Sequence, residues 1–175
     1  ITTVAGGNGH LGALGDGGAA TSAQLYQPSG VLLDAAGNLY IADTGHNSVR
    51  RVAASNGIID TYAGSVQGGY SGDSGPATSA KMWGPVALAF DNSGNLYIAE
   101  SARVRKVAAS TGVITTVAGN GTSHGGSGDG GLATSAEVSP EGIAVDSAGN
   151  LYLSNNHGAI REVDASTGII SRVVG

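Results

Sequence analysis

Four histidines are the residues of this sequence best suited to bind a metal ion or to transfer a proton at neutral pH. His46 and His157 occupy similar positions in two turns, whereas His10 and His124 lie in two longer loops. No glutamate lies at i+4 helical spacing from them, and no Gly-x-Ser-x-Gly segment with a charge-paired histidine is evident. We therefore expect surface histidines, and the sequence predicts no catalytic residue, no metal and no cofactor.

Three aspartates recur in glycine-rich segments and offer oxygen atoms of the kind that bind Ca²⁺. They are Asp16, Asp73 and Asp129, and each is followed by Ala-Thr-Ser-Ala. An aspartate at one fixed position before Thr and Ser more often accepts backbone N–H groups of its own loop and holds neighbouring units together. We therefore interpret these three residues as structural loop residues.

A hydrogen-bonded turn brace is expected near the first of these segments. Asp43, Asn47 and Arg50 have the residue types and the spacing for it. Glu100 and Asn155 occupy the position of Asp43 in the two related segments. The brace is therefore predicted for the first segment only.

Basic residues also recur, and a stripe of them could bind RNA. They are Arg50, Arg51, Arg105, Lys106 and Arg161. The chain has 8 Lys and Arg against 13 Asp and Glu, and its net charge of −5 disfavours a phosphate-binding surface. We expect these side chains to be solvated at the rim of the fold, with neither nucleic acid nor a membrane as a partner.

An internal repeat of about 56 residues positions all of these groups. The hexamer Ile-Thr-Thr-Val-Ala-Gly at 1–6 returns in related form at 59–64, 114–119 and 170–175. Gly-Asn-Leu-Tyr recurs in the same order at 37–40, 94–97 and 149–152. With 31 glycines and 12% charged residues, the composition favours short strands joined by tight turns.

One repeat unit contains four β-prone stretches separated by turn residues, which predicts a four-stranded antiparallel meander. In the first unit these stretches are 31–33, 39–42, 49–52 and 59–62. The first stretch is apolar and fits a strand packed on both faces, whereas the third carries charge and fits a position towards the outside. This order, from axis to rim, is typical of a propeller blade.

The pattern Pro-x-Gly-Val, Asp-x-x-Gly-Asn-Leu-Tyr-Ile-Ala-Asp-Thr-Gly-x-Asn and Val-Arg-Arg-Val resembles the bacterial form of the NHL repeat. The resemblance spans residues 1–175 and implies an all-β, NHL-type β-propeller, which usually has six blades. The second unit departs from the pattern, because Glu100-Ser101-Ala102-Arg103 shortens the turn that contains Asp43 to Asn47 in the first. Similar repeats occur in extracellular sensor domains, secreted proteins, RNA-binding regulators and lyases.

The repeat predicts one domain over 1–175, with a leading outer strand at 1–6 and three four-stranded blades at about 30–64, 85–119 and 141–175. Three blades cannot close a ring, so two copies are expected to form a six-bladed homodimer. Larger rings and filaments are alternatives. The strand at 1–6 either competes with 170–175 for the outer edge of a blade, pairs with a neighbouring molecule or stays unpaired.

The function predicted from this architecture is a non-enzymatic binding or assembly scaffold, secreted or on the cell surface of a bacterium. Its partners are a second copy of itself and a protein or carbohydrate ligand. The loops that vary most between repeats are the expected recognition sites, with His10, Leu11, Gln67, Tyr70, Ser123 and His124 as candidates. The alternatives are a lyase-type enzyme with a metal near the propeller axis, an engineered or evolved fragment without a natural ligand, and a subunit of an extracellular filament.

Overall fold

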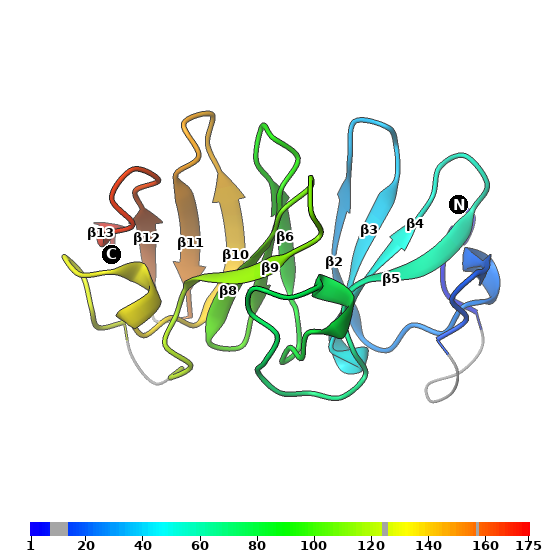
Figure 1. Cartoon of the computed structure of the whole chain (residues 1–175), viewed down its shortest axis with the longest axis horizontal. Helices are drawn as coiled ribbons and strands as arrows, with labels where there is room; N and C mark the ends of the chain where they lie inside the picture. The colour runs from blue at the N-terminus through cyan, green and yellow to red at the C-terminus, as the bar shows by residue number, and fades with distance from the viewer. Residues whose placement is uncertain (8–13, 124–125, 157) are drawn as a thin grey trace.

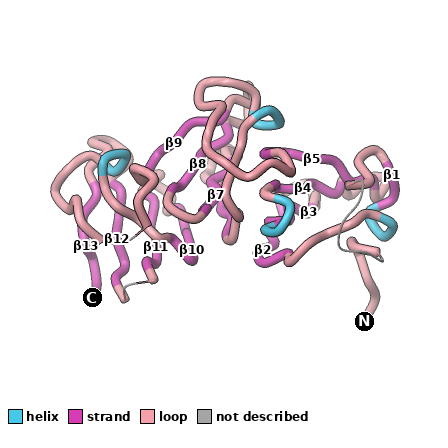
Figure 2. The backbone as a smooth tube through the Cα atoms, turned by 90° about the horizontal axis from the view of Figure 1, so that it is seen from below, coloured by secondary structure: helices cyan, strands magenta, loops and turns pink. Residues whose placement is uncertain are grey.

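A computed structural model describes residues 1–7, 14–123, 126–156 and 158–175, and it is built of antiparallel β-sheets arranged side by side as a fan (Figures 1 and 2). The predicted all-β propeller architecture is confirmed, with one sheet for each repeat. Blade 1 contains β2 (Pro28–Leu33), β3 (Leu39–Asp43), β4 (Ser48–Val52) and β5 (Ile58–Gly64). Blade 2 contains β6 (Ala87–Phe90), β7 (Leu96–Glu100), β8 (Arg103–Val107) and β9 (Ile114–Ala118). Blade 3 contains β10 (Pro140–Val145), β11 (Leu151–Asn155), β12 (Ala159–Val163) and β13 (Ile170–Val174).

The turn between the first two strands of each blade is fixed by an aspartate. In blade 1, Asp34 Oδ1 accepts the backbone N–H groups of Ala36 and Asn38 at 3.0 and 2.8 Å. Gly37 has φ of 82°, which disfavours residues with a Cβ. Asp91 and Asp146 make the corresponding bonds in the other two blades. The repeated Gly-Asn-Leu-Tyr segment therefore sets the register of the inner two strands.

A linker precedes each blade and runs along that blade's outer edge. The linkers contain the short 3₁₀ helices η1 (Ala20–Ser22), η3 (Ala77–Ser79) and η4 (Ala133–Ser135), formed by the repeated Ala-Thr-Ser segment. The first linker also contains β1 (Gly18–Ala19), which pairs with β5 and makes the sheet of blade 1 five-stranded. A further 3₁₀ helix, η2 (Thr44–His46), lies between β3 and β4. None of the described helices is long and apolar enough to cross a membrane.

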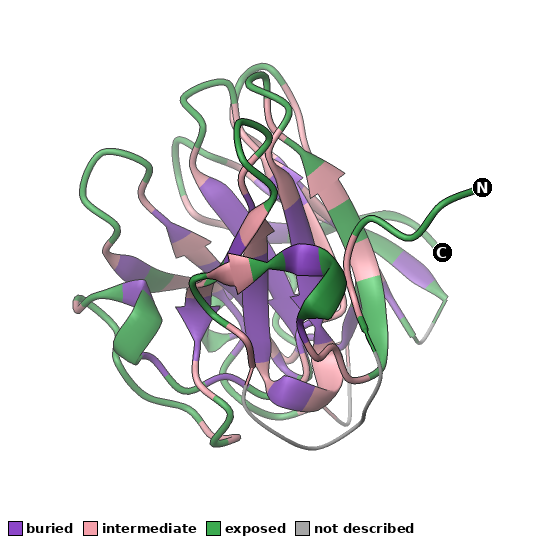
Figure 3. Ribbon diagram, turned by 90° about the vertical axis from the view of Figure 1, so that its right-hand side faces the viewer, coloured by how far each residue is buried: buried purple, intermediate pink, exposed green. Residues whose placement is uncertain are grey.

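Two hydrophobic core clusters lie between blades, where buried residues line the facing surfaces (Figure 3), and a third lies between blade 1 and its own linker. Tyr40, Val49 and Ala63 of blade 1 pack against Leu96 and Ile98 of blade 2. The next interface repeats this arrangement one blade further along the chain. We call the face of a blade that is turned towards the following blade its trailing face, and the opposite one its leading face.

Residues 1–6 form no strand in this structure, so the predicted leading strand is wrong. The segment is nonetheless placed by the linker, since the N–H groups of Gly6 and Gly7 donate to the carbonyls of Ala20 and Ala23 at 3.0 and 2.7 Å. Gly119 and Asn120, at the end of β9, make the same two bonds to the next linker. Residues 1–6 thus occupy the place of the outer strand of a preceding blade, and no such blade is present to pair with them.

Candidate functional site

The arginines at the second position of the charged strand segment are fully buried, so the prediction that they are solvated rim residues is wrong. Arg50, Arg105 and Arg161 each have 0% exposure. Their neighbours Arg51, Lys106 and Glu162 are half-buried instead. No stripe containing all five predicted basic residues is therefore available to bind RNA.

Each buried arginine joins the third strand of its blade to the linker before that blade. Arg105 donates to Asp73 Oδ1 at 2.6 Å and to the backbone carbonyls of Ser71 and Lys81 at 3.4 Å. Arg161 makes the same kind of contact with Asp129 at 2.8 Å, and Arg50 pairs with Asp16. Asp16, Asp73 and Asp129 therefore act as the anionic halves of three internal ion pairs, which accounts for the recurrence of one Asp in each linker and one Arg in each third strand.

The predicted brace in blade 1 is only partly formed. Asp43 Oδ1 accepts the N–H of Tyr26 at 2.7 Å, and its Oδ2 lies 2.9 Å from His46 Nδ1 and 3.6 Å from Arg50 Nη1. Asn47 does not join this group, because its Oδ1 accepts the N–H of Gly84 in the next linker at 2.9 Å.

A corresponding brace occurs in blade 2, so its predicted restriction to the first repeat is wrong. Glu100 accepts the N–H of Trp83 at 2.6 Å and contacts Arg105 at 3.3 Å. Burial raises the pKa of Glu100 above its ordinary value, although the hydrogen bond from Trp83 and the charge of Arg105 act in the opposite direction. Asn155 plays a neutral version of this role in blade 3, accepting the N–H of Ser139 at 3.3 Å.

Of the four histidines, only His46 falls within the described residues, and it is buried against Asp43 rather than on the surface as predicted. His10, His124, His157 and Leu11 lie outside those residues. Within the described ranges, no three His, Cys, Asp or Glu side chains are close enough together to hold a metal ion.

The remaining candidate recognition residues lie on two neighbouring loops. Gln67 is exposed, and the hydroxyl of Tyr70 donates to Asp73 Oδ2 at 2.9 Å. Tyr70 and Ser123 line the same hollow of about 290 Å³, which the structure places at the end of blade 2. The structure therefore brings together two of the variable loops that the repeat comparison singled out.

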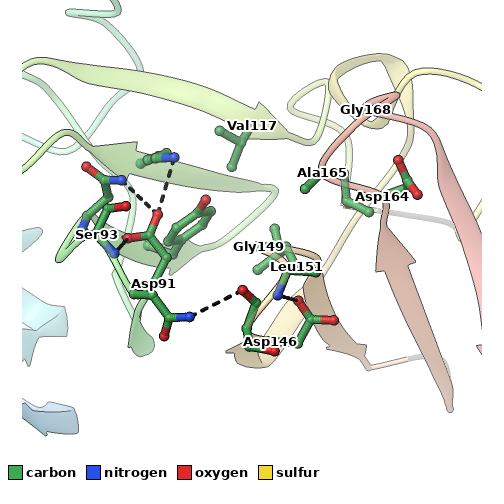
Figure 4. A pocket seen from close by; sticks show the side chains of 16 residues that line it. Asp91, Ser93, Val117, Asp146, Gly149, Leu151, Asp164, Ala165 and Gly168 are labelled. Carbon is green, nitrogen blue, oxygen red and sulfur yellow. Dashed lines mark hydrogen bonds and ion pairs between the residues drawn. The ribbon is translucent and has the colours of Figure 1, made fainter.

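A larger cleft lies between blades 2 and 3, at the opposite ends of their strands (Figure 4). We call it the seam cleft. It measures about 480 Å³, its apolar wall includes Val117, Leu151 and Val163, and three aspartates lie around it. These are Asp91, Asp146 and Asp164.

The seam cleft exists because two aromatic residues of the first blade interface are replaced by valines in the second. Between blades 1 and 2, the ring of Tyr40 packs edge-on against Tyr62 at 4.9 Å and Phe90 at 5.1 Å. The repeat places Val117 and Val145 at the positions of these two partners. The smaller side chains leave space beside Tyr97, the counterpart of Tyr40.

The aspartates of the seam cleft are held in the ionised form. Burial opposes ionisation of Asp91, but hydrogen bonds from Asn95 and Ser93 and the charge of Lys106 outweigh it and lower its pKa. Hydrogen bonds from Ser166 and Thr167 lower the pKa of Asp164 to about 2. These carboxylates can accept hydrogen bonds and positive charge, and they are poorly suited to donate a proton at neutral pH.

Comparison with known families finds two partial matches. The model of the Teneurin NHL domain matches residues 8–69, and that of the strictosidine synthase-like N-terminal region matches residues 132–162. No curated protein sequence matches the chain significantly.

Solved structures match over most of this chain. A protein of unknown function from Bacteroides thetaiotaomicron has 26% identity and a TM-score of 0.61, covering 72% of this chain and 32% of its own. Virginiamycin B lyase from Staphylococcus aureus has 18% identity and a TM-score of 0.55, covering 85% and 41%. A gluconolactonase from Xanthomonas campestris has 17% identity and a TM-score of 0.60, covering 94% and 51%. The chain spans about a third to a half of the length of these proteins, and the two enzymes share its fold at low identity.

Proposed function

Because the chain is built of NHL-type β-propeller blades, we propose that it is a non-enzymatic binding and assembly scaffold that completes its propeller with a second copy. The observation that carries this proposal is the state of the two end faces of the fan. Each exposes apolar side chains whose counterparts are buried or partly buried at the two internal interfaces.

The trailing face of blade 3 is the clearest case. Val49, Val104 and Ile160 are equivalent residues of blades 1, 2 and 3. Of these, only Ile160 has no following blade to pack against it. The two valines are 0% exposed, whereas Ile160 is 37% exposed. Val174 is 61% exposed, although its counterparts Ala63 and Ala118 are 0% exposed. A following blade would therefore bury an apolar surface of the kind that drives association.

The leading face of blade 1 is the matching surface. Its inner strand exposes Val31 and Leu33, at 68% and 63%. Their counterparts Leu88 and Phe90 are partly buried in the interface between blades 1 and 2. A second copy would cover Val31 and Leu33 with its own blade 3, and twofold symmetry would satisfy both pairs of faces at once.

A binding role is proposed in preference to catalysis because the described histidine and the three recurring loop aspartates are engaged in structural contacts. His46 is buried against Asp43, and each of Asp16, Asp73 and Asp129 is paired with a buried arginine. Activity of the lyase type, as in the matched enzyme, would need a proton-transfer group or a metal site. His46 and the three loop aspartates are occupied by these structural contacts, and the exposed end faces support assembly.

Light scattering across a dilution series tests the proposal. The expected species has twice the chain mass of 17.0 kDa. Ile160→Asp places a charge on the trailing face and should shift the mass towards the monomer, since burying an unpaired charge is costly. Val66→Asp is the matched control, because Val66 is an exposed apolar residue of the linker between blades 1 and 2. A wild-type monomer at all concentrations would refute the proposal.

A further inference from the structure

Three large side chains gather at one end of blade 2. They are Tyr70, Trp83 and Arg103. The third repeat has Gly126, Ser139 and Ala159 at these positions, and Arg103 replaces Ser48 of the first. The first repeat keeps an aromatic residue, Tyr26, at the position of Trp83. The third repeat builds its blade with small residues at all three positions, so blade architecture does not require the whole group.

The group is exposed and aromatic. Trp83 and Tyr70 are 55% and 44% exposed, and they are the two aromatic residues among the exposed large hydrophobic side chains of the described ranges. The ring of Trp83 is held in place by the variable loop, since a Cβ at Gly68 would lie 2.5 Å from its Cζ3 atom. Its backbone N–H is fixed to Glu100 at 2.6 Å. An exposed indole is thus presented by an ordered support.

Arg103 lines the same hollow as the two aromatic residues and has no ion-pair partner among the described residues. Its Cζ lies 3.6 Å from the centre of the Tyr70 ring, and Nη2 contacts the carbonyl of Asn120 at 3.3 Å. Within the described part of the chain, no carboxylate lies within ion-pair distance of it, because Glu100 is turned to Arg105 and to the N–H of Trp83. Its remaining donors border the hollow.

The hollow fits a small polar ligand with one flat apolar face. Its volume of about 290 Å³ is close to the lower end of small-molecule sites. Trp83 and Tyr70 offer apolar surface, while Arg103 and the nearby Ser101 and Ser123 offer hydrogen-bonding groups. Sugar rings combine C–H faces with hydroxyl groups in this way.

Single-stranded nucleic acid also stacks on aromatic rings, but the charge at this site opposes it. Glu100 lines the same hollow, and Asp73 lies beside Tyr70 on the adjoining surface. The net charge of the chain is −5. A phosphate backbone would meet these charges, whereas a saccharide would not.

We infer that Trp83, Tyr70 and Arg103 form a saccharide-binding site at the end of blade 2. The inference deepens the binding part of the proposed function by naming a ligand class. The site is formed by residues of one chain only. A failure of saccharide binding can therefore be distinguished from a failure of ring completion, which light scattering measures as the mass in solution.

Fluorescence titration tests the site directly, because Trp83 is the only tryptophan of the chain. The probes are maltopentaose, cellopentaose, xylopentaose, chitopentaose and penta-galacturonate. At least one should change Trp83 emission in a saturable manner. Arg103→Ala should then weaken that affinity about tenfold, as expected when a charged hydrogen-bond donor is removed.

Lys81→Ala is the matched control, since it removes an exposed positive charge from the same linker without altering the hollow. It should leave the affinity unchanged. Absence of a saturable change with all five saccharides, or equal affinity of Arg103→Ala and wild type, would overturn the inference. A saturable response to oligouridine with none to the saccharides would also overturn it and would assign the site to nucleic acid.

Discussion

Replacement of Arg105 by methionine tests whether the buried ion pairs hold the linkers to the blades. The guanidinium is fully buried and contacts Asp73 at 2.6 Å, Glu100 at 3.3 Å and two backbone carbonyls at 3.4 Å. Methionine has a similar stem but no charge or donor. Glu100, itself only 3% exposed, would then keep its charge in the interior without its cation. Removing one partner of such a pair costs about 3–5 kcal/mol.

Lys106→Met is the matched control on the adjacent residue of β8. The Lys106 side chain is 30% exposed, and its Nζ lies 3.4 Å from Asp91 Oδ2. A partly exposed pair of this kind contributes at most about 1 kcal/mol. The two substitutions therefore remove the same unit charge from neighbouring positions, and only burial and the number of contacts distinguish them.

Urea denaturation at one fixed protein concentration, followed by Trp83 fluorescence, measures both variants. Trp83 reports on this region because its backbone N–H donates a hydrogen bond to Glu100. Arg105→Met should lower the free energy of unfolding by about 3–5 kcal/mol, and Lys106→Met by less than about 1 kcal/mol. Equal losses for the two variants would refute the conclusion that the buried arginine holds linker and blade together.

Two further predictions concern acid stability and the seam cleft. Folding lowers the pKa of five aspartates below the ordinary 3.8, to about 2 for one of them, Asp164; the others are Asp34, Asp73, Asp91 and Asp146. The stabilisation of the folded state by these carboxylates is present above pH 3.8 and is lost as the pH falls through their folded pKa values. The melting temperature should therefore fall as the pH is lowered from 4 to 2. An unchanged melting temperature at pH 2 would contradict these pKa directions. Val117→Tyr restores the residue found at Tyr62 and should fill part of the seam cleft, raising the free energy of unfolding by roughly 1 kcal/mol through added ring burial. A loss of stability in urea denaturation would show that the cleft cannot accept the ring.

The repeat made the blades and their turns predictable from sequence. Tight turns need Gly and Asp at fixed positions, and the inner strands need apolar runs, so both leave a local signal. Charge within a strand does not by itself predict solvent exposure, since the three arginines are buried with carboxylate partners from the linkers. The signal for them is a long-range one, an Asp of the linker that recurs 32 to 34 residues before an Arg of the third strand.

The sites between repeats could not be predicted in the same way. The seam cleft depends on the combined volume of side chains from two blades, such as Val117 and Val145, which no single repeat reveals. The hollow beside Trp83 depends on a shortened turn and on a loop that folds over the indole ring. Tyr70 and Ser123 were accessible to sequence reasoning because their loops vary, whereas Arg103 was visible only as a departure within the shortened turn.

Disulfide cross-linking between end faces tests ring completion most directly, since the chain has no cysteine of its own. The contact of Tyr40 with Phe90, with ring centres 5.1 Å apart, corresponds by repeat position to Tyr152 of one copy and Leu33 of the other. The double variant Tyr152→Cys with Leu33→Cys should form, on oxidation, a covalent dimer of twice 17.0 kDa that resists dilution. Moving the second cysteine from Leu33 to Val66 should abolish it. An oxidised sample that stays monomeric, or that forms an open ladder of larger species, would contradict the completion of the propeller by two copies.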